Sequence, residues 1–510
     1  MADGDVLKQI ARGAMILFIG TFMLFAVRLI FRIFAARYLG AYNYGILTLG
    51  MMVLNVGMLI SMMGMREGVV RYIAYYREKK NFAKVKGTYL AAIKFGGTLG
   101  IILSSLAIIS AKYIAKYIFH NPELTPILII FALMIPIYTV FNITINALLA
   151  FKKAEYNVVS AVSKESLNLI LVLFLIFIGG TLLQFSLVYL LAVSFGMILS
   201  ILFLEIKTFP MIRSKLKAVY EYKKLLRFSY PLFFSGIFIT IMLWTDTFFL
   251  GYFKDEVAVG IYNVALPLAA SLGIFLIAFS YIFYPIMSEL YANNRIAELA
   301  TSYSTIIRWI FMLSLPVILI VVAFPKVILN LLFGASFVAG STALIILTLA
   351  YFGDIIIGPA RQVLMTFKKT KTIFKVNMIA AAVNVALNII LIPDYGINGA
   401  ALATGVSLVI REITFLHLAR RLVHFQYKIK YYLKCLFAGA ISISIVYYIT
   451  RGTQNIMLLT AMLVAYGIMY ISLLIVTKSF SKEDIMIVQA FETKLGLDKN
   501  PISNLLNRVI

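Results

Sequence analysis

Three ionisable side chains stand inside long apolar stretches of the sequence, where a charge is costly and marks a functional site by default. Arg28 and Arg32 are four residues apart, so they share one face of a helix. A planar guanidinium group suits the oxygens of a phosphate. We therefore predict that Arg28 and Arg32 bind a phosphate or pyrophosphate group. Asp246 lies in a second apolar stretch, at a depth similar to that of the arginines.

Two other interpretations of these three charges stay open. In one, Asp246 pairs with an arginine, and the salt bridge closes an outer gate or satisfies buried charge. In the other, Arg32 extends along its helix to the outer membrane interface.

Asp354 and Arg361 form a second candidate pair. They are seven residues apart in one predicted span, so we expect them on one helical face, two turns from each other. They are interpreted either as an ion pair or as a secondary polar site for a coupling ion or proton. Other charges in the spans, Lys164 and Glu165 among them, lie nearer the predicted cytoplasmic ends and are assigned to snorkelling or local pairing.

The elements that carry these residues are membrane spans. Hydrophobic residues make up 62% of the chain and the mean hydropathy is +0.97. The apolar stretches are continuous, whereas the strands of a membrane barrel alternate in polarity. We predict an all-α polytopic membrane protein with about 14 transmembrane helices.

An internal repeat organises these helices. Phe151-Lys152-Lys153 recurs as Phe367-Lys368-Lys369, Asn168 recurs as Asn384 at the same offset, and Gly45-Ile46 recurs as Gly260-Ile261. Repeats in membrane proteins are typical of transporters whose halves rock around a central site. We predict the following domains: a six-helix N-terminal lobe (1–212), an interfacial linker helix (213–227), a six-helix C-terminal lobe (228–431), two extra transmembrane helices (432–478) and an amphipathic cytoplasmic tail (479–510).

The formal net charge is +25, and the basic residues are distributed along the chain in a way that indicates the membrane topology. Lys and Arg concentrate in alternate loops, which places both termini in the cytoplasm. Because the positive charge is used for topology and for anionic lipid headgroups, we expect no nucleic-acid partner. Cys435 is the only cysteine and the three histidines are scattered, so we expect no metal site. No phosphate-binding G-x-x-x-x-G-K-[ST] loop is present, so energy must come from a gradient or the membrane potential.

Five sequence motifs stand out along the chain. They are Phe34-Ala35-Ala36-Arg37-Tyr38-Leu39-Gly40-Ala41-Tyr42-Asn43-Tyr44-Gly45, Asp246-Thr247-Phe248-Phe249-Leu250-Gly251-Tyr252, Tyr284-Pro285-Ile286-Met287-Ser288, Leu332-Phe333-Gly334, and the segment from Leu391-Ile392-Pro393 to Gly399-Ala400-Ala401. With these motifs, the sequence resembles the polysaccharide flippase family of the multidrug/oligosaccharidyl-lipid/polysaccharide exporter superfamily. The resemblance covers roughly residues 8–480.

The resemblance implies a two-lobed flippase of the cell membrane that works by alternating access. It would move a lipid-linked oligosaccharide, on a polyprenyl phosphate or pyrophosphate carrier, for the synthesis of cell-surface polysaccharide or glycoprotein. We expect the partners to be this substrate and membrane lipids. We expect the protein to act as a monomer near glycan-synthesis enzymes and to need no cofactor, with Na⁺ or H⁺ as a possible coupling ion. No catalytic residues are assigned, because we expect no enzyme.

Three alternatives remain. A peptidoglycan-precursor flippase of the same superfamily also fits the arginines of the first span. A drug or cation antiporter usually has an acidic site in its first half, where this chain has Arg28 and Arg32. A membrane glycan polymerase or ligase would need a large outer loop with acid and base residues, and the longest outer loop, at about 110–125, offers only His120 and Glu123.

Overall fold

The protein is helical throughout the part that the structure describes. A computed structural model describes residues 2–427, 429–450 and 456–479, and none of them forms a strand. Most of the predicted tail, residues 480–510, lies outside the described residues. The α-helices are α1 (Ala2–Met62), α2 (Met65–Glu78), α3 (Phe82–Tyr113), α4 (Leu124–Ala150), α5 (Ala154–Ile178), α6 (Leu182–Lys207), α7 (Tyr222–Phe253), α8 (Glu256–Ala270), α9 (Ile274–Ala292), α10 (Ile296–Ala323), α11 (Pro325–Phe333), α12 (Ser341–Ile357), α13 (Ala360–Thr366), α14 (Thr370–Arg420), α15 (Ile429–Thr450) and α16 (Ile456–Val476).

The helices confirm the predicted membrane protein. In the described residues, 11 helices are long and apolar enough to cross a membrane, and α16 contributes a shorter apolar helix. Helices α1 and α14 are each interrupted by a glycine with positive φ, at Gly40 (φ 70°) and Gly396 (φ 53°). Only glycine adopts this backbone without strain, so each long helix reads as two spans. With these two breaks and α16, the described helices match the predicted count of about fourteen spans.

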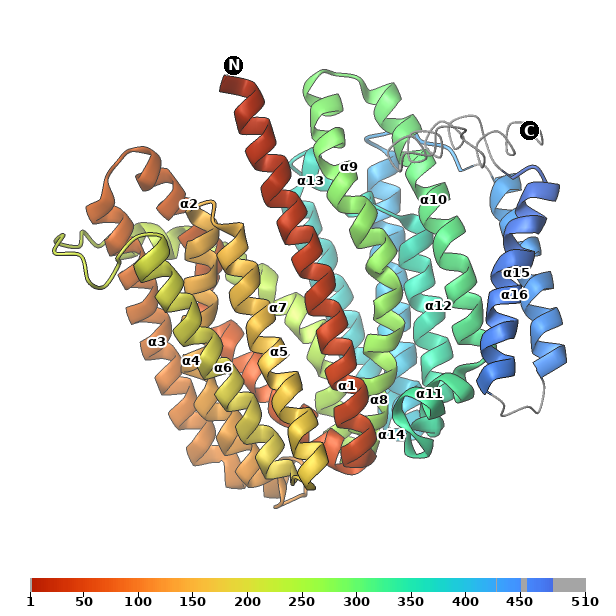
Figure 1. Ribbon diagram of the computed structural model, residues 1–510, viewed down its shortest axis with the longest axis horizontal. Coiled ribbons are helices and arrows are strands. Elements are labelled where there is room, and N and C mark those ends of the chain that lie inside the picture. Colours follow the sequence, from red (N-terminus) through yellow and green to blue (C-terminus); the bar gives the residue numbers. More distant parts are fainter. Residues whose placement is uncertain (1, 428, 451–455, 480–510) are drawn as a thin grey trace. The chain divides into compact units, whose positions relative to one another are not determined.

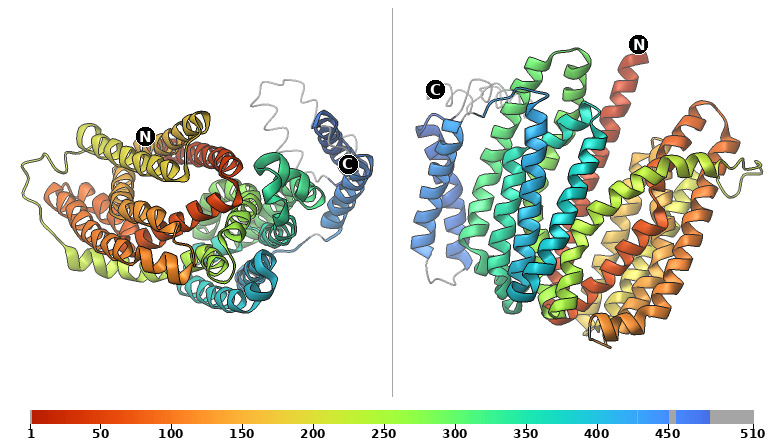
Figure 2. Two further views of the ribbon diagram at one scale, coloured as in Figure 1. Left: turned by 90° about the horizontal axis from the view of Figure 1, so that it is seen from below. Right: turned by 180° about the vertical axis from the view of Figure 1, so that it is seen from behind.

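The described chain divides into two compact units. The first runs to Leu268 and also includes Lys326–Leu347 and Lys371–Arg411, while the second contains the remaining described residues. In the first unit, α3 to α6 lie side by side, and α4 packs against α1, α3 and α6 (Figures 1 and 2). In the second unit, α10 packs against α9 and α15, and α15 against α16. The predicted lobe boundaries stay predictions.

Small residues allow α1 to approach its neighbours closely. A Cβ atom on Gly50 or Gly57 would meet the side chains of Phe131 or Ile135 on α4 at 2.4–2.5 Å. Gly45 comes closer still to α8, because its added Cβ would lie 1.8 Å from the carbonyl oxygen of Glu256. Helices in membranes commonly associate through small residues in this way, since lipid supplies no hydrophobic driving force between them.

The contact between α1 and α8 is reciprocal. A Cβ on Gly260 of α8 would lie 2.0 Å from the carbonyl oxygen of Ala41 on α1, and a Cβ on either glycine would lie 3.1 Å from the backbone nitrogen of the other. Gly45 and Gly260 are also the two residues that the internal repeat relates. The two copies of the repeat therefore cross at equivalent points, close to Gly40 and at the predicted outer ends of both helices.

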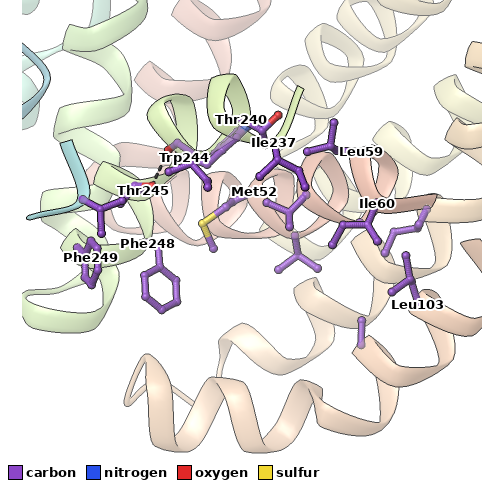
Figure 3. Close-up of a pocket in the computed structure, with 17 residues that line it drawn as sticks. Met52, Leu59, Ile60, Leu103, Ile237, Thr240, Trp244, Thr245, Phe248 and Phe249 are labelled. Carbon is purple, nitrogen blue, oxygen red and sulfur yellow. Dashed lines mark hydrogen bonds between the residues drawn. The ribbon is translucent and has the colours of Figure 1, made fainter. Parts of the chain in front are cut away.

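A cavity of about 630 Å³ opens between α1, α3 and α7 (Figure 3). Its walls are almost entirely apolar, and Trp244 of α7 is among them. All of its lining residues belong to the first unit.

The linker between α6 and α7 is extended where an interfacial helix was predicted. Residues 215–221 have no helical structure, and α7 begins at Tyr222, so the prediction of a helix at 213–227 is wrong for this segment. The backbone nitrogen of Val219 donates to the carbonyl of Ala83 at 3.0 Å, and a Cβ on Gly87 would lie 1.9 Å from the Val219 carbonyl oxygen. Backbone pairing with the start of α3 thus replaces the local helix that the amphipathic pattern indicated.

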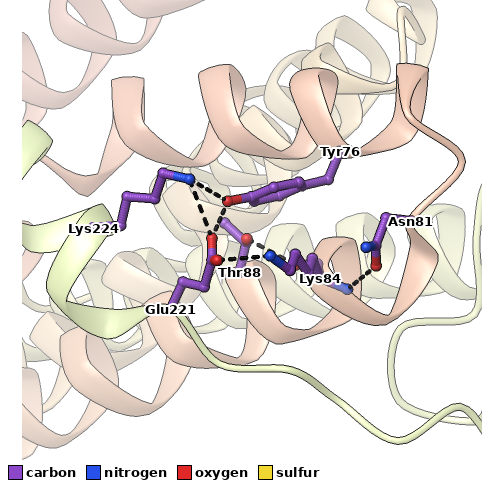
Figure 4. Close-up of polar contacts among 6 residues, drawn as sticks. All are labelled: Tyr76, Asn81, Lys84, Thr88, Glu221 and Lys224. Carbon is purple, nitrogen blue, oxygen red and sulfur yellow. Dashed lines mark hydrogen bonds and ion pairs between the residues drawn. The ribbon is translucent and has the colours of Figure 1, made fainter.

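Hydrogen bonds and an ion pair hold the end of this linker at Glu221. Lys84 of α3 donates to Glu221 at 2.8 Å, the hydroxyl of Tyr76 on α2 also donates to Glu221, and Lys224 donates to Tyr76 at 3.0 Å (Figure 4). The linker is therefore held against both α2 and α3.

The close contact between Gly45 of α1 and the backbone of α8 can be tested by substitution. Gly45→Ala forces a methyl group into the α8 backbone, and we expect a loss of stability of roughly 1–3 kcal/mol. Gly97→Ala in α3 is the matched control, since a Cβ there meets nothing within 4 Å. That control is expected to be neutral or stabilising by up to about 1 kcal/mol. Thermal unfolding in detergent tests both, and equal stabilities of the two variants would contradict the close crossing.

Candidate functional site

Arg28 takes part in a charged cluster inside the first unit. Its Nε donates to Glu165 Oε1 of α5 at 2.8 Å, and Lys164 Nζ approaches the same oxygen at 2.8 Å. The side chains of Lys164 and Glu165 are buried, at 3% and 6% exposed, whereas Arg28 remains 56% exposed. One carboxylate thus holds two cations, and the cluster keeps a net positive charge. The more exposed of the two cations is the guanidinium.

Aromatic rings surround the buried lysine. Lys164 Nζ lies 5.1 Å from the ring centre of Tyr138 on α4 and 5.8 Å from that of Tyr189 on α6. The negative faces of these rings stabilise an ammonium group that has left water. Phe31 of α1 packs edge-on against Tyr189, with 6.3 Å between the two ring centres. Residues of α1, α4, α5 and α6 therefore together position the cluster.

One interpretation left open by the sequence paired Asp246 with an arginine, and the structure instead pairs Arg28 with Glu165. The reason is packing: α1 lies against α5 within the same helical bundle, so the nearest carboxylate belongs to α5. Lys164 and Glu165 do pair locally, as predicted, but their pair forms the base of the candidate site. Arg32 lies beside the phenol of Tyr44, across the bend at Gly40, so the two arginines have different partners.

Asp246 is the centre of a separate polar site, and it is fully buried. Tyr262 of α8 and Thr404 of α14 both donate to its Oδ2. Asn388 and Asn384 of α14 donate to its Oδ1 at 2.6 and 3.3 Å. Among the described residues, no basic side chain forms an ion pair with it.

A carboxylate in this position needs a positive charge. Burying an unpaired ionised carboxylate is very costly, and neutral hydrogen-bond donors only partly offset the loss of water. The oxygen of the Asn388 amide is buried and has no hydrogen-bond partner, which leaves a second acceptor beside Asp246. Carboxylate, amide and hydroxyl oxygens here could hold a small hard cation, and the carboxylate alone could hold a proton.

Asp354 and Arg361 do not share a helical face. Asp354 belongs to α12, which ends at Ile357, and Arg361 belongs to α13, which begins at Ala360. Gly358 between them has a φ of 71°, so the helix that the sequence indicated is broken. The prediction of one face is wrong, while a role as a secondary polar site stays a prediction.

The partners of Asp246 were not predicted from the sequence, although two of them carry a signal in it. Asn384 and Asn388 are four residues apart in an apolar span, and this spacing places two amides on one face of a helix. Tyr262 and Thr404 carried no such signal, because only packing brings α8 and α14 to the same carboxylate.

The repeated helices and the buried charges define a polytopic transporter, in the flippase group of the multidrug/oligosaccharidyl-lipid/polysaccharide exporter superfamily. The chain belongs to the polysaccharide biosynthesis protein family, whose profile matches residues 10–291, and the MatE profile matches residues 231–390.

Individual relatives are distant. An uncharacterized membrane protein of Methanocaldococcus jannaschii is 26% identical over 435 residues, which cover 81% of this chain and 83% of the relative. A probable low-salt glycan biosynthesis flippase, Agl15, of Haloferax volcanii is 27% identical over 188 residues, which cover 36% of this chain and 39% of that protein. The fold is similar to that of the lipid II flippase MurJ in an inward closed conformation. The TM-score is 0.74 at 17% identity, and the match covers 90% of this chain and 98% of that one.

The Glu165 carboxylate, which pairs with both Arg28 and Lys164, can also be tested by substitution. Glu165→Gln leaves Lys164 buried without its counter-charge, and we expect a loss of about 3–5 kcal/mol of stability. Adding Lys164→Met should restore most of it, because no buried charge at that position then remains. Glu298→Gln is the control, since that exposed partner of Arg295 should contribute at most about 1 kcal/mol. Unfolding midpoints check all three, and a harmless Glu165→Gln would refute the buried pair.

Proposed function

We propose that the protein flips a lipid-linked oligosaccharide across the cell membrane, carried on a polyprenyl phosphate or pyrophosphate. The observation that carries this proposal is the net positive cluster of Arg28, Lys164 and Glu165. Glu165 occupies Nε of Arg28 and fixes the side chain, while more than half of that side chain stays accessible. An accessible guanidinium that is held in place by a buried carboxylate is well prepared to bind phosphate oxygens.

The membership of the family supports the same class of substrate. The family is named for polysaccharide biosynthesis, and one relative is described as a probable glycan biosynthesis flippase. Agl15 and MurJ are described as flippases, which agrees with our expectation that the chain is not an enzyme. That the protein acts as a monomer near glycan-synthesis enzymes stays a prediction.

We infer that the Asp246 site couples transport to a cation gradient. Its carboxylate is buried among hydroxyl and amide groups, without a basic partner in the described residues, and therefore takes up a proton or Na⁺ when it is closed from water. Tyr262, Thr404 and the two asparagines come from α8 and α14, so the charge on the Asp246 carboxylate acts directly on the contacts that join these helices to α7.

The alternatives differ in their cargo. A flippase for a peptidoglycan precursor would use the same phosphate-binding cluster, and only the glycan separates it from the proposed function. A drug or cation antiporter would require an attractive site for a cation in the first repeat. The net positive charge around Arg28 disfavours that cargo.

The third prediction concerns the cationic cluster. In proteoliposomes that contain a fluorescent polyprenyl-pyrophosphate oligosaccharide, Arg28→Ala should slow flipping roughly tenfold or more, because a hydrogen bond to a charged group contributes about 1.5–3 kcal/mol. Arg295→Ala removes an arginine from an exposed pair with Glu298 and should leave the rate unchanged. Leaflet-resolved quenching of the fluorophore measures the rate. If the wild type moves no lipid-linked sugar but expels organic cations, the antiporter replaces this proposal.

The fourth prediction concerns coupling. Asp246→Asn keeps the shape of the side chain but removes its charge, so flipping should no longer respond to an imposed Na⁺ or H⁺ gradient. Asp255→Asn is the matched control, because that exposed carboxylate only accepts from the backbone of Ala258 at the start of α8. The same flipping assay with and without each gradient makes the comparison. A gradient response that persists in Asp246→Asn would rule out this carboxylate as the coupling site.

A further inference from the structure

The cavity beside α7 has a lining suited to hydrocarbon. No charged residue lines it, and polar side-chain atoms come only from Thr240, Trp244 and Thr245. The hydroxyl of Thr245 already donates to the carbonyl of Ile241 within the same helix. Figure 3 shows the apolar side chains of α1, α3 and α7 turned toward the open space between them. Water in such a space would find almost no hydrogen-bond partners.

The cavity is long in the direction of the membrane-spanning helices. Its lining runs from Met52 to Ile60 on α1 and from Ile237 to Phe249 on α7. At 1.5 Å per residue, these stretches measure roughly 12 and 18 Å. That length is about half of a hydrocarbon core of about 30 Å. An elongated apolar space along the helices matches an extended hydrocarbon chain better than a compact drug-like molecule.

Several side chains around the cavity are open to the surroundings of the helices. Val56 on its wall is 36% exposed, and the neighbouring Leu243 of α7 and Leu106 of α3 are 52% and 58% exposed. On membrane-spanning helices, exposed apolar side chains face lipid. These exposed side chains give the helices around the cavity an apolar outer surface, along which a chain from the bilayer would meet no charged group.

We propose that this cavity binds one hydrocarbon chain of a bilayer lipid. The volume of about 630 Å³ is within the usual range of ligand cavities, roughly 300–1,000 Å³. None of the lining residues is charged, and the cationic cluster of Arg28, Lys164 and Glu165 lies outside the lining, so an occupant is held by its hydrocarbon chain and needs no phosphate group.

The bound chain would contact the helices of the coupling site. Thr245 and Val385 line the cavity, and they are the sequence neighbours of Asp246 and Asn384. The lipid therefore packs against α7 and α14 next to the turns that hold the buried carboxylate. Binding itself does not depend on the proposed transport function, and its test needs no transport.

The chain offers a natural probe, since Trp244 and Trp309 are its only two tryptophans. In a Trp309→Phe background, all tryptophan emission comes from the cavity wall. The protein is reconstituted into phosphatidylcholine vesicles whose acyl chains carry bromine near their middle, and bromine quenches tryptophan at short range. Emission from Trp244 is expected to be strongly quenched relative to vesicles of the unbrominated lipid.

Variants that fill the cavity distinguish quenching by a bound chain from quenching by the lipid that surrounds any membrane protein. Ala107→Phe on α3 and Val56→Phe on α1 place rings in the cavity from two different walls, and both should lose most of the quenching. Leu106→Phe adds similar bulk on the adjacent residue of α3, which does not line the cavity, and should keep it. A monodisperse elution profile confirms that each variant is folded.

Three results would overturn the proposal. Equal quenching in all variants would mean that Trp244 senses only surrounding lipid. Absence of quenching in the parent protein would mean that bilayer chains do not enter. Recovery of emission on adding unbrominated polyprenyl phosphate, but not on adding the same amount of unbrominated phosphatidylcholine, would identify the substrate's isoprenoid tail as the occupant. Recovery to the same extent with both lipids would support a site for bulk hydrocarbon chains.

Discussion

The structure depends on the high cost of an ionised group in hydrocarbon. The chain meets this cost in two ways. In the first repeat, Glu165 lies between Lys164 and Arg28, so charges of opposite sign compensate each other and a surplus cation remains. Around Asp246, hydroxyl and amide groups surround a lone carboxylate, and its compensation must come from a proton or a bound cation. We propose that the first arrangement attracts an anion, and that the second one changes its charge by gaining or losing a cation.

These two solutions are a divergence between copies of one ancestral unit. Asn168 and Asn384 occupy equivalent positions, and Asn384 contacts Asp246 while the amide oxygen of Asn168 is buried without a partner. At the same offset, Lys164 and Glu165 correspond to Ala380 and Ala381, which carry no charge. The repeat therefore kept its helices and exchanged its polar residues. The proposed anion site in one copy and the proposed cation site in the other fit the coupled transport of a phosphate-bearing lipid that we propose.

Glycine sets where the helices can touch and bend. Gly45 and Gly260 bring the backbones of α1 and α8 together at equivalent points of the repeat, and Gly40 and Gly396 break two long helices at their predicted outer turns. A contact made by backbone atoms and small residues contains no interlocking side chains that would have to be unpacked. Helices joined in this way can separate and close again at modest cost, which suits the alternating access that the family resemblance implies.

Hydropathy along the chain was enough to predict the helical membrane class and the approximate number of spans, and it singled out Arg28 and Asp246 as candidate site residues. These properties follow from hydropathy, local periodicity and the cost of a charge in lipid, all of which can be read along one chain. Only the tertiary structure decided which charges meet. It paired Arg28 with Glu165, gathered Tyr262, Asn384, Asn388 and Thr404 around Asp246, and broke the segment between Asp354 and Arg361 at Gly358. The contacts around Arg28 and Asp246 join different helices, from 16 to 158 positions apart in the chain. They depend on how helices pack against one another, because the pattern within a single helix does not contain that information.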